Sequence, residues 1–388
     1  MSSLPVAKVS PKGADRWSRG HPWIYRTDVR SAPDQPGLCR VVDPRGKCIG
    51  TALHSPRSEI RLRLLTRDDS PIGAAWWRER LATCLAARAG IDATAYRVVH
   101  GEGDGLPSLV VDRYDRWLVV QLLSAGIETA RTEILTALAE LLEPQGILLR
   151  NDVVVRGREG LPQEITLAAG SVPEQIEVRE GRVRYLAAPW SGQKTGAFLD
   201  QRPNRMLAAE LTRPGGTALD CFTYHGSFAL HLGGTAGHVT ALDVSAEALA
   251  RGVANAALNR LENIEWLEGD VFEVLRRFER ERRRFDTVVV DPPAFAKMKS
   301  AVPQALGGYK EVNLRAMRLL APGGMLLTAS CSFHVRRPEF QAMLEAAAAD
   351  SGRRLVLTHL LGQGADHPEV ITIPETGYLK GAILRAST

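Results

Sequence analysis

From residue 190 onward, short apolar runs alternate with amphipathic stretches. The run 287–290 is almost entirely β-branched and predicts a strand that is buried on both faces of a covered sheet. It ends at Asp291, which two prolines follow, and proline cannot extend a strand ladder. Further strands are expected at 217–222, 238–242, 264–267, 325–330, 354–361 and 378–384, with helices at 227–232, 246–259, 271–281, 309–320 and 339–349. This alternation predicts a doubly wound α/β sheet, in which ligands bind at the carboxyl ends of the strands.

The residues before 190 follow other patterns. Residues 4–67 contain short strand-like runs at 37–43, 46–50 and 60–65, which predict a small β-rich unit. Residues 70–189 mix helices expected at 74–89 and 127–142 with strands expected at 108–112, 117–123, 147–149 and 153–155 and a hairpin around Gly181. We therefore predict three domains, at 1–69, 70–189 and 190–388.

Composition narrows the class of protein. The chain of 388 residues is 45% hydrophobic, yet it contains no uncharged apolar run of the ~18 residues that a membrane span needs. Residues 1–9 lack the apolar core of a signal peptide. The five cysteines are irregularly spaced and include no Cys-x-x-Cys pair, which argues against a disulfide framework and a structural zinc site. We expect no metal and a reducing, cytoplasmic location.

The positive charge is concentrated at the N-terminus. Residues 1–67 hold 3 Lys and 10 Arg against 5 acidic residues, a net charge of +8, whereas the whole chain carries +5. A preference for arginine over lysine explains the residue type but not this asymmetry, which is typical of nucleic-acid binding. Aromatic and basic side chains alternate within it, and the candidates for RNA contact are Lys12, Arg16, Trp17, Arg19 and Arg26. The alternative, which we favour for Trp23, is that the tryptophans anchor a small core.

The turn after the expected strand 217–222 contains a single glycine, Gly226. A dinucleotide-binding fold would carry Gly-x-Gly-x-x-Gly at this place, so that a pyrophosphate could approach the backbone. The residues Phe222, Thr223 and Tyr224 stand there instead. The turn is therefore poorly suited to NAD or FAD, but it can accept a ligand without phosphates.

Acidic residues follow the neighbouring strands. Asp243 lies 17 residues after Gly226, where an acid can accept the hydroxyls of a ribose. Asp270 and Asp291 follow two further strands. Three acids along one sheet edge match an adenosine with a cationic appendage, which is S-adenosylmethionine. The alternatives are that Asp270 is only a helix N-cap and Asp243 only a turn residue.

A cysteine separates two kinds of methyl transfer. Asp-Pro-Pro followed by an aromatic residue occurs in methyltransferases that act on exocyclic amines, and here Ala294 stands before the aromatic Phe295. Cys331 ends the strand expected beside the one that bears Asp291. Carbon 5 of cytosine is a poor nucleophile, and a thiolate adding to carbon 6 makes carbon 5 reactive, whereas an amine needs no such help. The alternative is that Cys331 is a small buried hydrophobe, as we expect of the other four cysteines.

Several motifs together resemble one family. They lie at 21–25, 103–114, 194–202, the turn 222–226, 291–293, 330–332, 365–368 and 378–381. In these segments the chain resembles the PUA-containing bacterial large-subunit ribosomal RNA cytosine-5 methyltransferases. The resemblance implies a β-barrel-like PUA domain, a middle α+β domain and a C-terminal Rossmann-like class I methyltransferase domain. It also implies S-adenosylmethionine as cofactor and 23S ribosomal RNA as substrate, and it permits a homodimer.

The resemblance also implies roles for single residues. Cys331 is expected to be the nucleophile, and Asp291 to hold the target base beside the cofactor. Asp243 and Asp270 are expected to bind ribose and adenine, and Phe222, Thr223, Tyr224 and Gly226 to surround the methionine part. Gln201 and Arg202 are expected to make polar contacts at the cofactor-side rim. Where some RNA cytosine-5 methyltransferases place a second cysteine, this chain has Pro293 and Ala294, so that a two-cysteine release is not supported.

Two rival functions remain at this point. One is an RNA methyltransferase that uses Asp291 and its prolines on an exocyclic base nitrogen, without the thiol. The other is a noncatalytic RNA-binding or ribosome-assembly protein that retains a cofactor pocket. The set of acids together with Cys331 favours the cytosine-5 methyltransferase.

Overall fold

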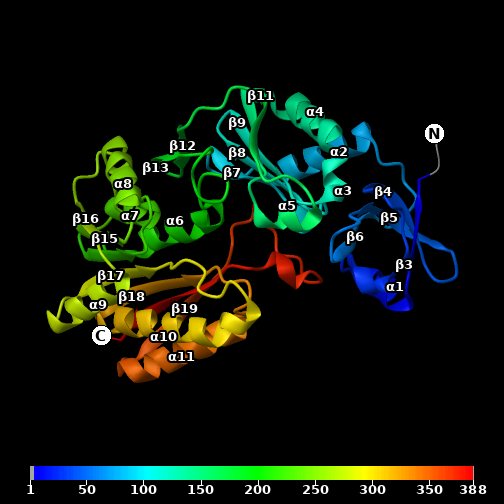
Figure 1. Cartoon of the computed structure of the whole chain (residues 1–388). Coiled ribbons are helices and arrows are strands. Elements are labelled where there is room, and N and C mark those ends of the chain that lie inside the picture. Colours follow the sequence, from blue (N-terminus) through cyan, green and yellow to red (C-terminus); the bar gives the residue numbers. More distant parts are fainter. Residues whose placement is uncertain (1–3, 388) are drawn as a thin grey trace. The chain divides into compact units, whose positions relative to one another are not determined.

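The structure is a computed structural model that describes residues 4–387. Residues 1–3 and 388, at the ends of the first and third predicted domains, lie outside the described part. Contacts group the chain into two compact units (Figure 1). The first holds the residues up to Val178 with Ala187–Leu199 and Ala365–Thr376, and the second holds Arg179–Leu186, Asp200–Gly364 and the residues from Gly377. The first unit thus takes in the first predicted domain and the second one except Arg179–Leu186, together with residues 190–199 and Ala365–Thr376 of the third.

The N-terminal residues form a six-stranded sheet in the order β2-β6-β5-β4-β1-β3. Its strands are β1 (Val6–Val9), β2 (Trp23–Tyr25), β3 (Val29–Ser31), β4 (Gly37–Val42), β5 (Cys48–His54) and β6 (Ile60–Thr66). The predicted β-rich unit is therefore confirmed. The sequence pattern missed the helix α1 (Pro11–Ser18), although Ser10 caps it by accepting a hydrogen bond from the backbone of Gly13 at 3.1 Å.

A second sheet in the same unit has five strands, in the order β11-β10-β9-β8-β7. The strands are β7 (Ala95–His100), β8 (Leu109–Tyr114), β9 (Trp117–Leu122), β10 (Gly146–Arg150) and β11 (Ile165–Gly170). The accompanying helices are α2 (Ala74–Ala86), α3 (Ala125–Glu128), α4 (Arg131–Leu142) and α5 (Val154–Glu159), and a hairpin of β12 (Ile176–Glu180) and β13 (Val183–Ala187) follows. The mixture of helices and strands agrees with the expected α+β character.

The strand expected at 153–155 is wrong, because α5 begins at Val154. The valines favour a strand locally. The buried side chain of Arg156 is held by Glu128 at 2.7 Å and by the carbonyl of Pro162 at 2.8 Å. These contacts, one of which comes from a residue 28 positions away, outweigh the local preference.

The second unit contains a seven-stranded sheet in the order β16-β15-β14-β17-β18-β20-β19. Its strands are β14 (Thr217–Cys221), β15 (His238–Asp243), β16 (Ile264–Glu268), β17 (Phe285–Val290), β18 (Leu320–Ser330), β19 (Leu355–Leu361) and β20 (Lys380–Ala386). The strands from β16 to β18 in this order are parallel to their neighbours. β20 is antiparallel to both β18 and β19. The predicted doubly wound sheet is confirmed, with its topological switch point between β14 and β17.

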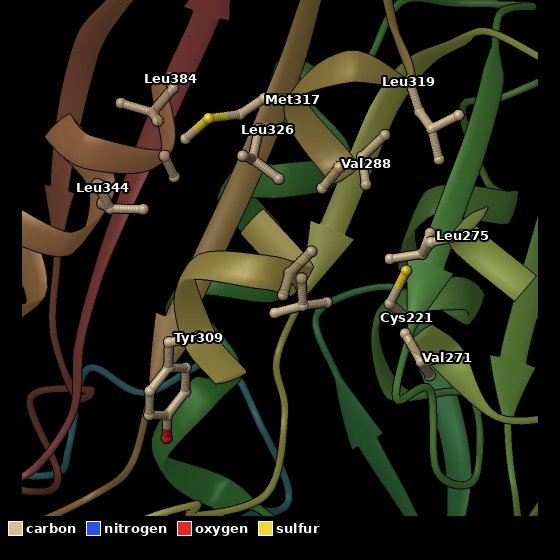
Figure 2. Packing of buried hydrophobic residues seen from close by; sticks show 14 of the residues in the cluster. Cys221, Val271, Leu275, Val288, Tyr309, Met317, Leu319, Leu326, Leu344 and Leu384 are labelled. Atoms are coloured by element: carbon tan, nitrogen blue, oxygen red, sulfur yellow. The ribbon is translucent and has the colours of Figure 1, made fainter. Parts of the chain in front are cut away.

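Helices cover both faces of this sheet (Figure 1). On one face lie α9 (Val271–Arg280), α10 (Val302–Arg318) and α11 (Arg337–Ser351); on the other lie α6 (Arg202–Leu211), α7 (Ser227–Gly233) and α8 (Ala246–Leu258). Val288 and Val290 belong to the core cluster of α9–α11, and Val289 belongs to that of α6 and α7. Figure 2 shows Val288 in the first of these clusters, with Leu326 beside Met317. The apolar run of β17 therefore follows from burial on both faces.

Two helices of this unit begin at a side-chain cap, one of them the N-cap considered for Asp270. Ser245 accepts a hydrogen bond from the backbone of Ala248 at the start of α8, and Asp270 accepts one from Glu273 at the start of α9. Of the helices formed by residues 4–387, none is long and apolar enough to span a bilayer.

Candidate active site

Five neighbouring strands of the C-terminal sheet end at the residues that the sequence singles out. In spatial order, β16 leads to Asp270, β15 to Asp243, β14 to the turn 222–226, β17 to Asp291 and β18 to Cys331. Because parallel strands present their carboxyl ends at one edge, these groups gather at the switch point of the sheet. The structure thus brings the predicted cofactor and catalytic residues of this unit together.

The turn after β14 is held in an unusual backbone conformation. Phe222, Tyr224 and Gly226 have φ values of +63°, +55° and +88°. A Cβ at Gly226 would lie 2.6 Å from the ring of Trp266, so glycine is required by both conformation and space. Left-handed backbone at two residues other than glycine persists only where the surrounding structure imposes it, as at ligand sites.

Asp243 fixes this turn from the neighbouring strand. Its Oδ2 accepts the backbone N–H of Tyr224 at 2.8 Å, and its Oδ1 accepts that of Ser245 at 3.0 Å. Asp243 therefore has the role of a turn residue, which was considered as the alternative to ribose binding. An ionised carboxylate has about four acceptor positions, so capacity for ribose hydroxyls remains. Val244, next in the chain, is an exposed apolar side chain that the sequence reading missed.

Asp220 is a further residue of this turn that the sequence reading did not select. Its Oδ2 accepts hydrogen bonds from the hydroxyl of Thr223 at 2.5 Å and from the backbone of Ala229 at 2.9 Å. Burial, reinforced by the charges of Asp291 and Asp243 and opposed by those two hydrogen bonds, raises the pKa of Asp220 to about 7. An acid within the otherwise apolar strand β14 was the available signal.

The electrostatics of this edge fit a cationic ligand. The negative charges of Asp243 and Asp291 disfavour ionisation of Asp220. A sulfonium or ammonium group placed among them relieves that repulsion. Asp270 is exposed, and its Oδ1 caps α9 by accepting the backbone N–H of Glu273. Its Oδ2 is therefore available for a ligand. The residues present therefore fit S-adenosylmethionine.

The start of α6 is joined to the end of the central strand. Gln201 donates through Nε2 to Oδ1 of Asp291 at 2.9 Å, while its Oε1 accepts from Asn204 at 2.6 Å. Asn204, which the sequence reading missed, also donates to the carbonyl of Gly362 at 2.9 Å. Arg202 is 7% exposed at the first position of α6. Gln201, which was expected at the cofactor-side rim, thus orients the carboxylate of Asp291.

Cys331 is partly exposed and lies against the Asp-Pro-Pro segment. Its Sγ is 4.0 Å from the carbonyl oxygen of Pro292. The next residue, Ser332, accepts from the backbone of Ala296 at 3.1 Å and shares a hydrogen bond with Tyr309 at 2.8 Å. The loops after β17 and β18 are therefore tied together, which places the thiol beside the segment that bears Asp291.

The other cysteines have different surroundings. Cys39, Cys84 and Cys221 are buried, and burial raises the pKa of Cys39 and of Cys84 to about 12. They behave as the expected small hydrophobes. Cys48 is only partly buried, so that expectation does not hold for it. Within residues 4–387, no group of three or more His, Cys, Asp and Glu side chains is arranged to hold a metal ion.

The predicted RNA-contacting residues lie on and beside α1. Lys12 is exposed, Arg19 is 77% exposed beside Asp15, and the guanidinium of Arg16 lies 4.5 Å from the ring centre of Tyr25. Arg26 follows β2 and is 56% exposed. The basic side chains are thus placed at the surface of this sheet.

Trp17 requires a correction. It is 1% exposed and belongs to the core cluster under the six-stranded sheet. Its ring therefore cannot stack on a base in this fold, and the prediction that it contacts RNA is wrong. Burial of a large indole removes much apolar surface from water, which stabilises a small core. Trp23 is partly exposed and donates to Glu102 at 2.9 Å.

Comparisons with known proteins agree with this arrangement. Residues 7–67 match the family model of the PUA-like domain, and residues 96–384 match that of S-adenosylmethionine-dependent methyltransferases. The protein named ribosomal RNA large subunit methyltransferase I from Enterobacter sp. (strain 638) is 36% identical over 397 residues, covering 98% of this chain and 100% of the relative. The protein of the same name from Aeromonas hydrophila is 39% identical over 381 residues, covering 95% and 96%.

Solved structures share the fold. A candidate SAM-dependent methyltransferase from Streptococcus mutans superposes with a TM-score of 0.82 at 19% identity, covering 98% of this chain and 99% of that one. The candidate methyltransferase SMU.776, complexed with SAH, superposes with a TM-score of 0.85 at 19% identity and the same coverage. The chain therefore belongs to the S-adenosylmethionine-dependent methyltransferases with an N-terminal PUA-like domain, the family of the proteins named ribosomal RNA large subunit methyltransferase I.

Proposed function

We propose that this protein methylates carbon 5 of a cytosine in large-subunit ribosomal RNA. The observation that carries the proposal is the partly exposed thiol of Cys331, 4.0 Å from the carbonyl of Pro292 in the segment that follows β17. The relatives are named ribosomal RNA large subunit methyltransferase I, and this name supports large-subunit ribosomal RNA as the class of substrate. The exposed basic residues of the PUA-like domain support RNA as the polymer.

The cofactor supplies a methyl group as an electrophile. Its ribose is assigned to Asp243 and its adenine end to Asp270, while the turn 222–226 surrounds the methionine part. Arg202 and Gln201 form the rim on the side of α6. The electrostatic fit of Asp220, Asp243 and Asp291 to a cation supports this placement.

The thiolate of Cys331 attacks carbon 6 of the cytosine and forms a carbon–sulfur bond. The electrons of the 5,6 double bond then make carbon 5 nucleophilic, so that it takes the methyl group. Loss of the proton from carbon 5 restores the double bond as the carbon–sulfur bond breaks and the electron pair returns to sulfur. Asp291, oriented by Gln201, holds the polar edge of the base during these steps. The cytosine must be unstacked, because carbon 6 is shielded within a helix.

The substrate also bears on location and assembly. Ribosomal RNA as substrate places the protein in the cytoplasm, which is part of this proposal. The three domains are assigned as RNA binding for 1–69, a connector or substrate platform for 70–189 and methyl transfer for 190–388. The homodimer that the family resemblance permits stays a prediction, which sizing of the purified protein tests.

A large-subunit ribosomal RNA transcript that carries 5-fluorocytidine in place of cytidine tests the thiol mechanism. Fluorine at carbon 5 cannot leave as a proton does, so the wild type should form a covalent adduct that survives denaturing electrophoresis. Cys331→Ala should form none, and Cys48→Ser, which removes another partly exposed thiol, should form it normally. A Cys331→Ala protein that still methylates unmodified RNA would exclude the thiol mechanism.

The methylated nucleoside separates the rival functions. Digestion of the methylated RNA followed by mass spectrometry should show 5-methylcytidine. An N-methylated base together with an active Cys331→Ala variant would favour the exocyclic-nitrogen alternative. RNA binding without any methyl transfer would favour the noncatalytic alternative.

A further inference from the structure

Lys380 lies beside the candidate nucleophile and was not selected from the sequence. It is the first residue of β20 and pairs with Ser330, the last residue of β18, in the antiparallel register. Cys331 follows Ser330 directly. Lys380 is 4% exposed, so its ammonium group is withdrawn from water at the end of β18, which Cys331 follows.

Lys380 is held by neutral groups. Its Nζ donates to the carbonyl of Ser332 at 2.5 Å and to that of Tyr378 at 2.9 Å. Among residues 4–387, no carboxylate forms an ion pair with it at 4.0 Å or less. Buried charges are normally paired, since carbonyl dipoles compensate only part of the loss of hydration. Lys380 is therefore a buried cation that lacks an ordinary counter-ion.

The charged groups around Lys380 come from several elements. Burial lowers its pKa to about 8, and the strongest opposing influence is the charge of Cys331. Arg337 of α11 lowers the pKa, whereas Glu339 of the same helix raises it more weakly than Cys331 does. Glu339 is engaged at the start of α11, where it accepts the backbone N–H of Arg336 at 2.8 Å. Cys331 is thus the group whose ionisation best compensates the buried ammonium.

Two other titratable residues belong to the segments packed around Cys331. The hydroxyl of Tyr309 in α10 shares a hydrogen bond with the hydroxyl of Ser332. The pKa of Tyr309 is raised by burial and by the charge of Cys331. Asp291 follows β17, next to the Pro292 carbonyl that Cys331 approaches. A negative charge on either residue disfavours a thiolate, so a nearby cation is needed to favour it. Lys380 is that cation.

We propose that Lys380 is a positioning residue whose buried ammonium stabilises Cys331 as a thiolate. The inference rests on the proposed role of Cys331 as nucleophile. The two hydrogen bonds to the carbonyls of Ser332 and Tyr378 hold the ammonium in place at the end of β18. The same charge stabilises the thiolate when the carbon–sulfur bond breaks at the end of the reaction. Lys380 transfers no proton in this scheme and acts through Cys331 alone.

Alkylation of Cys331 tests the inference without RNA or cofactor. In a Cys48→Ser background, the rate of iodoacetamide modification of Cys331 is followed by mass spectrometry from about pH 5 to about pH 10. Lys380→Met should move the midpoint to higher pH by about one unit, which is about tenfold slower alkylation near neutrality. Lys380→Arg should keep the midpoint, as should Lys310→Met, which removes a lysine of α10 paired with Asp350. An unchanged midpoint in Lys380→Met overturns the inference.

A second measurement avoids substitution of Lys380, which is buried. NMR titration of isotope-labelled lysine side chains follows Lys380 in the wild type and in Cys331→Ala. Because the coupling is mutual, removal of the thiol should lower the pKa of Lys380. An unchanged pKa of Lys380 contradicts the inference. If the fluorocytidine adduct forms while both titrations are unaffected, the inference fails and the proposed function stands; if Cys331→Ala remains an active methyltransferase, the proposed function fails whatever the titrations show.

Discussion

Gln201 donates a hydrogen bond to Asp291 at 2.9 Å, although the two residues are 90 positions apart in the chain. Asn204 holds the other end of the Gln201 amide at 2.6 Å. The acid at the end of β17 is therefore oriented by the start of α6, a relationship that no local sequence pattern contains.

Replacing Gln201 should impair catalysis more than folding. Gln201→Leu keeps the approximate shape but leaves Asp291 without this donor, so we expect kcat to fall by about tenfold, the equivalent of one hydrogen bond to a charged group. Methyl transfer to ribosomal RNA measures the effect. Gln341→Leu, on the exposed face of α11, is the matched control and should be neutral. Equal activity in the two variants would remove Gln201 from the site.

Asp243 should matter for the cofactor and not for RNA. In Asp243→Asn, one of the two oxygens that accept the backbone of Tyr224 and Ser245 becomes an amide donor, which opposes that N–H group and loosens the turn. Calorimetry with S-adenosylhomocysteine should show affinity reduced by about tenfold or more. Asp286→Asn is the control, since Asp286 accepts the backbone of Thr217 at the other end of the sheet. Parallel losses of cofactor and RNA affinity in Asp243→Asn would contradict the assignment.

Asp220 should make the stability of the protein dependent on pH. Its pKa of about 7 in the folded state lies above the ordinary value of 3.8, so the folded state binds the extra proton between these values. Its contribution to stability is complete below about pH 4 and is lost as the pH rises through about 7. Asp220→Asn can keep both hydrogen bonds, since Thr223 and Ala229 donate to the same oxygen.

The free energy of unfolding in urea, measured from about pH 4 to about pH 8 without cofactor, checks this prediction. We expect Asp220→Asn to show a flatter profile than the wild type, with a difference on the order of 1–3 kcal/mol across this range. A wild-type profile that rises through neutrality in the same way as that of the variant would show that Asp220 is ionised in the folded state.

The exposed arginines of the N-terminal sheet should bind phosphate. Among residues 4–387, Arg19 and Arg26 form ion pairs with exposed acids. Such pairs contribute little to stability, so both guanidinium groups can exchange partners. In the double variant Arg19→Gln with Arg26→Gln, the slope of log affinity for RNA against log salt should fall by about 1 to 2. Filter binding at several salt concentrations measures it. Replacing Arg276 and Arg277, which are similarly exposed and paired on α9, should leave the slope unchanged if the PUA-like domain is the RNA-binding part.

Much of the fold could be predicted because its signals are local. The apolar run of β17 reflects burial on both faces, and the N-cap role considered for Asp270 depends on a hydrogen bond that spans three residues. The one-glycine turn at Gly226 and the acids after successive strands indicated the class of cofactor, because parallel strands present their ends at one edge. The position of Cys331 after a strand beside that of Asp291 followed from the same order.

Only the tertiary structure decided what depends on distant partners and on exposure to water. Trp17 is a core residue because side chains from other elements enclose it. Val154 begins a helix because Arg156 of that helix is buried and bound by Glu128. The raised pKa of Asp220 is a consequence of complete burial, which its apolar neighbours in sequence suggest but do not establish. The pairing of β20 with β18 placed Lys380 beside Cys331. Hydration and electrostatic coupling are properties of the packed state, and hydrophobic periodicity along a chain does not contain them.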